Sequence, residues 1–140
     1  MNLIIDSNIL ISALIKDSLT RKIIIESDWR FYYPEMSFHE VRKYKTLVLE
    51  KSGIDEEEYG QILQLLLEHI SLIPQEQFIL RIQNAYSLIG SRDPDDVVFL
   101  ALAMSIENSK LWTNDLDFRS QTAIQVLGTE QIVKLFRESL

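Results

Sequence analysis

The sequence has no cysteine, and this absence excludes both a disulfide framework and a thiolate metal site. Any metal ion that the chain binds must therefore be held by oxygen atoms or by its two histidines. Ligand sets rich in oxygen favour hard cations, so Mg²⁺ or Mn²⁺ is the expected type of ion.

Long apolar segments are missing as well. The longest apolar run, residues 97–104, is too short to cross a bilayer. Near the N-terminus, Asp6, Ser7 and Asn8 interrupt the stretch that would have to be apolar in a signal peptide. We therefore expect a cytoplasmic protein that does not enter a membrane.

Glycine and proline are scarce, with four and three residues, and the chain has no repeat or linker-like segment. Secondary-structure elements must therefore follow one another closely. A chain of 140 residues with 46% hydrophobic content can build one buried core. These features predict a single domain over residues 1–140.

Basic residues are outnumbered, with 14 Lys and Arg against 21 Asp and Glu, for a net charge of −7. This sign is wrong for a protein that binds nucleic acid by electrostatics alone. The objection weakens if several acids share a metal site, because a bound divalent ion offsets two of them and attracts phosphate.

Short apolar strands alternate with helical segments along the whole chain, which is typical of a parallel sheet covered on both faces. The pattern predicts an α/β protein, a three-layer α/β/α sandwich with a central, mainly parallel sheet of four to five strands. The expected strands are residues 2–6, 30–33, 70–73, 110–113 and 123–127, and the expected helices begin near residue 8 and cover 37–48, 56–69, 75–89, 94–107 and 129–140.

Acidic residues stand where chemistry is expected in such a sheet. Asp6 closes the first strand and Asp115 follows the fourth, while Glu40 and the group Asp93, Asp95 and Asp96 stand at helix starts. Ligands of open parallel sheets bind beyond the carboxyl ends of the strands. We expect these four segments to deliver their acids to one cleft.

Each acid also has a purely structural interpretation. Glu40 can complete a capping box with Ser37, Asp93 can be a helix N-cap, and Asp6 can accept backbone N–H groups of the next helix. These interpretations leave the coincidence of all four unexplained. Crowded carboxylates repel one another unless a cation is bound or a proton is retained. Acids without a nearby nucleophile fit metal-assisted hydrolysis of a phosphodiester.

Taken in order, these motifs resemble the PIN domain family. The chain carries an Asp, a small polar residue and Asn after the first strand, an acid early in a helix, acids before a Leu/Ala-rich helix, and Thr-x-Asp after a later strand. The resemblance covers residues 2 to about 128, in the segments Asp6-Ser7-Asn8, Glu40, Asp93-Pro94-Asp95-Asp96 with the helix that follows, and Thr113-Asn114-Asp115 with Asp117.

The resemblance implies a metal-dependent endoribonuclease that cleaves RNA with Mg²⁺ or Mn²⁺, often the toxin of a VapBC-type toxin–antitoxin pair that forms a homodimer and binds a small antitoxin protein. The resemblance assigns Asp96 as the third family acid, because Asp96 has the matching offset from the Leu/Ala run. Asp93 and Asp95 remain alternatives for this position. The implied catalytic acids are Asp6, Glu40, Asp96 and Asp115, the metal ligands are Asp6, Asp96 and Asp115 with Asp93 and Asp117 as further candidates, and Asn8 and Thr113 orient the ligands.

Other interpretations of the same pattern are weaker. A receiver domain or a DxD phosphotransferase shares the sheet and the first Asp, but the second enzyme needs Asp where Asn8 stands. An inactive PIN-like binding protein and an RNA-processing nuclease outside a toxin–antitoxin pair both remain open. His39 could bind metal or donate a proton, although its position at a helix start favours an exposed surface residue.

Overall fold

The computed structural model describes residues 1–15, 18–90 and 93–140. Its centre is a sheet of five strands in the order β3-β2-β1-β4-β5, and every neighbouring pair is parallel. This confirms the predicted parallel sheet. The strands are β1 (Asn2–Ile5), β2 (Arg30–Pro34), β3 (Ile70–Ile73), β4 (Ser109–Trp112) and β5 (Val126–Leu127).

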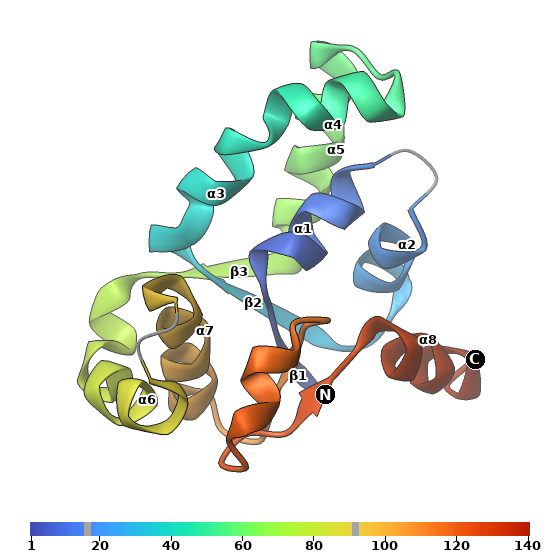
Figure 1. Ribbon diagram of the computed structural model, residues 1–140. Coiled ribbons are helices and arrows are strands. Elements are labelled where there is room, and N and C mark those ends of the chain that lie inside the picture. Colours follow the sequence, from blue (N-terminus) through green and yellow to red (C-terminus); the bar gives the residue numbers. More distant parts are fainter. Residues whose placement is uncertain (16–17, 91–92) are drawn as a thin grey trace.

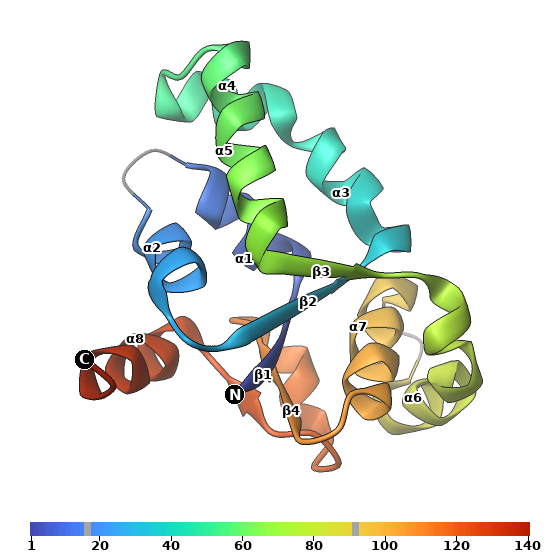
Figure 2. The same cartoon turned by 180° about the vertical axis from the view of Figure 1, so that it is seen from behind.

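Helices cover both faces of the sheet, so the fold is the predicted three-layer sandwich (Figure 1). One face carries α1 (Ser7–Leu14), α2 (Leu19–Glu26), α3 (Phe38–Lys43), α4 (Lys45–Ser52) and α5 (Glu56–His69). The opposite face carries α6 (Ile82–Ile89) and α7 (Pro94–Ser105), and α8 (Thr129–Glu138) lies near α2, as the view from behind shows (Figure 2).

The core forms where β1 packs against α7. Leu3, Ile4 and Ile5 have no exposed surface, and all seven residues from Val97 to Ala103 are buried. A strand covered on both faces and a helix surrounded by protein both require apolar residues on every side, which explains their continuous apolar runs. Within the described residues, no helix is long and apolar enough to cross a membrane.

Strand β1 also determines where a site can form. Its neighbours β2 and β4 are far apart in the sequence, so the strand order reverses at β1. A crevice opens beyond the carboxyl end of a strand at such a reversal point. The backbone N–H of Asp6 still bonds to the carbonyl of Trp112, at 3.3 Å, so Asp6 enters this region at the end of the ladder.

The largest departure from the predicted elements lies between Pro74 and α6. Residues 75–89 were expected to form one helix, but the chain forms two 3₁₀ turns, η2 (Gln75–Gln77) and η3 (Ile79–Arg81), before α6. Phe78 separates them with a φ of −136°, which is outside the helical range, and its side chain is buried. The helix predicted over 75–89 is therefore wrong for residues 75–81, and the break falls where Phe78 enters the core.

Three smaller differences also have local causes. Only Val126 and Leu127 of the expected strand 123–127 are assigned to β5, because the buried Gln121 amide bonds to the carbonyls of Phe118 and Ile124 and holds the preceding residues in a turn. The helix expected over 37–48 divides into α3 and α4 at Tyr44. Helix α2 was not predicted.

Candidate active site

Asp6 is fixed at the centre of the site by hydrogen bonds to both of its carboxylate oxygens. As the N-cap of α1, it accepts the backbone N–H of Ile9 at 2.9 Å through Oδ1, and it accepts the hydroxyl of Thr113 through Oδ2. The prediction that Asp6 accepts a backbone N–H of the next helix is therefore correct for Oδ1. Burial raises the pKa of Asp6, and these hydrogen bonds act in the opposite direction.

Thr113 joins the two strand ends that carry acids. Its buried hydroxyl oxygen donates to Asp6 and also accepts the backbone N–H of Asp115 at 3.0 Å. The ends of β1 and β4 are therefore held together by one side chain. Asn8 lines the same cleft, and its backbone N–H bonds to Asp6 and lowers the pKa of that carboxyl.

Glu40 faces the cleft and does not form the predicted capping box. Ser37 lies in the turn η1 (Glu35–Ser37) with ψ near 0°, and it makes no side-chain cap bond to α3. An N-cap residue that bonds in this way has extended backbone, which explains why the box fails. The Oε1 atom of Glu40 is buried and has no hydrogen-bond partner in the described part of the chain. Burial, followed by the nearby charge of Asp95, raises the pKa of Glu40.

The first turn of α7 supplies three acids with different surroundings. Asp93 is the N-cap, as predicted, and accepts the backbone N–H of Asp95 at 2.9 Å, while Pro94 takes the first helical position. Asp96 is partly buried. Burial, with the charges of neighbouring acids led by Asp93 and Asp115, raises the pKa of Asp96 to about 7.

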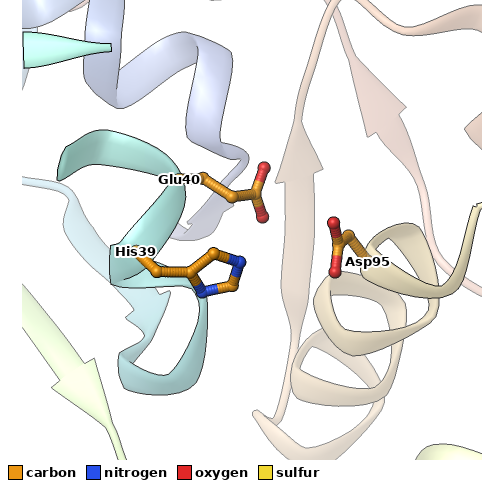
Figure 3. A group of neighbouring side chains, drawn as sticks. All are labelled: His39, Glu40 and Asp95. Atoms are coloured by element: carbon orange, nitrogen blue, oxygen red, sulfur yellow. The ribbon is translucent and has the colours of Figure 1, made fainter. Parts of the chain in front are cut away.

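Two groups of candidate metal ligands result from this arrangement. Asp96, Asp115 and Asp117 have carboxylate oxygens within 4.8 Å of one another. A second group consists of His39, Glu40 and Asp95, whose ligand atoms also lie within 4.8 Å of one another. Figure 3 shows these side chains facing one another between α3 and α7. Asp115 also caps the 3₁₀ turn η4 (Leu116–Ser120) by accepting the backbone N–H of Asp117.

The four predicted acids line one cleft of about 100 Å³, although Asp117 is not among its lining residues. Two larger hollows, of about 510 and 620 Å³, lie on α8 and beside α6, and neither gathers carboxylates from separate segments. The cleft is lined by Asp6, Ser7, Asn8, Glu40, Asp93, Asp95, Asp96, Phe99 and Asp115.

The residues present fit a divalent cation. None of the described residues that line the cleft is basic, so no side chain there neutralises its carboxylates. Glu40 Oε1 lacks a hydrogen-bond partner among the described residues, and the raised pKa of Asp96 means that its charged form is unfavourable without a cation. Carboxylate donors of this kind suit hard ions.

Some contacts at this site were not predicted from the sequence. Asp95 joins Glu40, and Ser7 lies 2.6 Å from the hydroxyl of Tyr33 beneath the cleft. Asn114 accepts the backbone N–H of Thr129 at 2.8 Å and thereby holds the loop of Asp115 against the start of α8. Asn114 is the middle residue of the Thr-x-Asp motif, and that position does not predict its hydrogen bond to Thr129.

A family model for the PIN domain matches residues 4–135. The chain belongs to the PIN domain family. PIN domains are generally metal-dependent nucleases that act on RNA, so membership suggests nuclease activity, and the acidic cluster of this PIN domain is compatible with metal binding. A search of curated proteins found no significant match to the chain.

Proposed function

We propose that this PIN domain is an endoribonuclease that hydrolyses RNA phosphodiester bonds with Mg²⁺ or Mn²⁺. The observation that carries the proposal is the convergence of Asp6, Glu40, Asp96 and Asp115, from four separate segments, on one cleft at the carboxyl edge of the sheet. Structural roles explain individual hydrogen bonds of these acids, but they do not explain why four carboxyl groups share one space that no described basic residue lines.

The acids have different parts in this proposal. Asp6, Asp96 and Asp115 would hold the cation, with Asp93 and Asp117 as further ligands. A bound divalent ion supplies charge to stabilise the phosphate and acidifies bound water. Glu40 is suited to accept a proton from attacking water, because its Oε1 has no competing hydrogen bond and its pKa is raised.

Thr113 and Asn8 would position Asp6 from outside the ligand set. Thr113 is the better supported of the two, since its hydroxyl contacts both Asp6 and the backbone of Asp115. This arrangement keeps two acids from different strands in fixed relative positions and reduces the reorganisation needed for catalysis.

The chemistry of the cleft suits the phosphate backbone of an RNA strand. Six of its lining residues are acids, so the cleft fits ions and a phosphate group better than a nucleobase. Arg42 and Lys43 are exposed on α3, the helix that carries Glu40, and they can contact backbone phosphates as the strand crosses the cleft.

Cleavage of labelled single-stranded RNA by the purified protein tests this function. We expect cutting with Mg²⁺ or Mn²⁺, no cutting with EDTA, and loss of most activity in Asp6→Asn. Asp28→Asn, which changes an exposed acid outside the cleft, is the matched control and should cut like the parent. If Asp6→Asn cut as well as the parent, Asp6 would not be a ligand. An inert binding protein would cut under none of these conditions.

We further propose that the protein is the cytoplasmic toxin of a VapBC-type pair, that residues 1–140 form one PIN domain, and that the chain forms a homodimer and binds a small antitoxin. Exposed apolar side chains support association, notably Leu80 at 90% and Leu116 at 74% exposure. Growth arrest on expression, relieved by Asp6→Asn, tests the toxin role, and the mass of the purified protein in solution tests the dimer.

A further inference from the structure

We propose that the cleft has a second cation position of different chemistry, formed by His39, Glu40 and Asp95, which takes a first-row transition ion in preference to Mg²⁺. The position adds a nitrogen ligand to the cleft and uses Glu40, the proton acceptor of the proposed function, as a ligand. An ion bound to Glu40 would prevent Glu40 from accepting the proton, so the inference rests in part on that function. The group at Asp96, Asp115 and Asp117, in contrast, offers oxygen alone.

The orientation of the His39 ring is the first observation. Its Nδ1 lies 3.0 Å from the carbonyl oxygen of Met36, which can only accept, so Nδ1 carries the proton of that hydrogen bond. The other ring nitrogen, Nε2, faces the carboxylates of Glu40 and Asp95 (Figure 3). Histidines that bind metal typically donate their second ring N–H in this way, which fixes the tautomer and exposes the ligand lone pair.

One unsatisfied oxygen of Glu40 is the second observation. Ser7 bonds to the Glu40 carboxyl and lowers its pKa, but Oε1 is buried without a hydrogen-bond partner among the described residues, and the carboxyl group points across the gap toward Asp95. A buried carboxylate oxygen that lacks a donor costs free energy unless a cation or a proton satisfies it. This observation does not depend on the hydrogen bond between His39 and Met36.

His39 lies close enough to Glu40 for its charge to lower the pKa of that carboxyl, but it forms no ion pair with either carboxylate. Within the described residues the one ion pair joins Lys45 to Glu56. The ligand atoms of the three residues nevertheless lie within 4.8 Å of one another. Two ligands bound to one ion at roughly 2.0–2.2 Å are at most about 4.4 Å apart, so small side-chain movements would bring all three onto a common ion.

The donor set determines the kind of ion. One imidazole nitrogen with carboxylate oxygens suits Zn²⁺, Fe²⁺, Co²⁺ or Ni²⁺, whereas Mg²⁺ prefers oxygen and retains its water. Helix α3 supplies His39 and Glu40, and α7 supplies Asp95. A bound ion would therefore join the two helices that lie on opposite sides of the cleft.

Nuclear magnetic resonance of the ¹⁵N-labelled parent tests the position without any activity measurement. The chain has two histidines, so His69, which is exposed at the end of α5, serves as an internal reference. An equimolar amount of Zn²⁺ should shift the Nε2 resonance of His39 while Nδ1 keeps its proton, and His69 should not move. Mg²⁺ should leave the Nε2 resonance of His39 in place.

Calorimetric titration of His39→Gln and His69→Gln provides the second test. Loss of a direct ligand should weaken Zn²⁺ binding at least about tenfold in His39→Gln, because even outer partners of metal ligands cost 10–100-fold. Mg²⁺ affinity should stay unchanged, and His69→Gln should behave as the parent. His39 is exposed, so its replacement should not disturb folding.

The outcomes separate this inference from the proposed function. If Zn²⁺ binds the parent without shifting His39, or binds His39→Gln as tightly, the second position is refuted while the carboxylate site stands. If the parent binds neither Zn²⁺ nor Mg²⁺, both proposals fail. If Mg²⁺ shifts the His39 Nε2 resonance as Zn²⁺ does, the claimed preference for a transition ion is wrong.

Discussion

Without metal, the stability of the near-isosteric variant Asp96→Asn relative to the parent should increase as the pH rises. The pKa of Asp96 is raised from its ordinary value of 3.8 to about 7, so between these values the folded state holds a proton that the unfolded chain has released. The parent therefore loses stability as the pH increases toward 7. Above pH 7 the stabilisation from the proton on Asp96 is fully lost. Asn has no proton to lose.

The magnitude follows from the pH interval. Between pH 5 and pH 7 the two pKa units correspond to about 3 kcal/mol at 1.4 kcal/mol each, and solvent screening of the partly buried carboxyl reduces this to about 1.5 kcal/mol. At about 3 °C per kcal/mol, the melting temperature of Asp96→Asn should rise by about 5 °C relative to the parent from pH 5 to pH 8. The lost attraction to the dipole of α7, about 0.3–1 kcal/mol, reduces this gain without reversing it.

The assay is thermal unfolding in EDTA at both pH values, with Glu58→Gln as the matched control. Glu58 is the third residue of α5, as Asp96 is of α7, but it is exposed and far from the cleft. Its replacement should not reproduce the pH-dependent gain. Parallel behaviour of the two variants would refute the argument, because it would reduce Asp96 to an ordinary acid at a helix start.

Added Mn²⁺ should stabilise the parent by about 2.7 kcal/mol at a hundredfold excess over its dissociation constant, and should stabilise Asp96→Asn much less. The gain should be larger at pH 8 than at pH 5, where the proton competes with the cation for Asp96. Equal shifts in the two proteins would show that Asp96 is only part of the helix start, and Asp93 would then be the ligand to test.

Two further substitutions separate structural from chemical roles. Asp93→Ala should lower the free energy of unfolding by about 0.5–2 kcal/mol, because it removes the N-cap hydrogen bond. Asp93→Ser keeps a capping side chain and should unfold like the parent. Weaker Mn²⁺ binding by Asp93→Ser would therefore identify Asp93 as a ligand. Thr113→Val should lower the free energy of unfolding by about 1–3 kcal/mol, because Asp6 Oδ2 loses its hydrogen-bond donor. Thr113→Ser keeps the hydroxyl and should retain most of the stability of the parent. Chemical denaturation measures both, and a valine variant as stable as the parent would contradict the bridging role.

The sequence predicted the sheet well because its determinants are local. Apolar strands such as residues 2–5 must be covered on both faces, and the acids that follow β1 and β4 necessarily come to the same edge of a parallel sheet. The predicted N-cap at Asp93 depends only on its neighbours Pro94 and Asp95, and it is present. In each case the deciding interactions lie within a few residues or follow from strand direction alone.

The remaining features depend on contacts between distant segments. The helix predicted over 75–89 is interrupted at Phe78, whose side chain is buried in the core, and the local sequence pattern does not reveal where such a break falls. Ser37 and Glu40 have the spacing of a capping box, but the turn before α3 gives Ser37 the wrong backbone conformation. The group formed by His39 and Asp95 requires α3 to face α7, which no local pattern specifies.

The Thr113 bridge also determines when the site can first exist. It joins residues 107 positions apart, so Asp6 is synthesised well before Thr113 and Asp115. A ribosome-bound chain that has not yet exposed β4 lacks one half of the cleft and the hydroxyl that holds Asp6. If the proposed nuclease function is correct, nascent chains and truncations that end before Thr113 should not cut RNA, because cleavage requires both halves of the cleft.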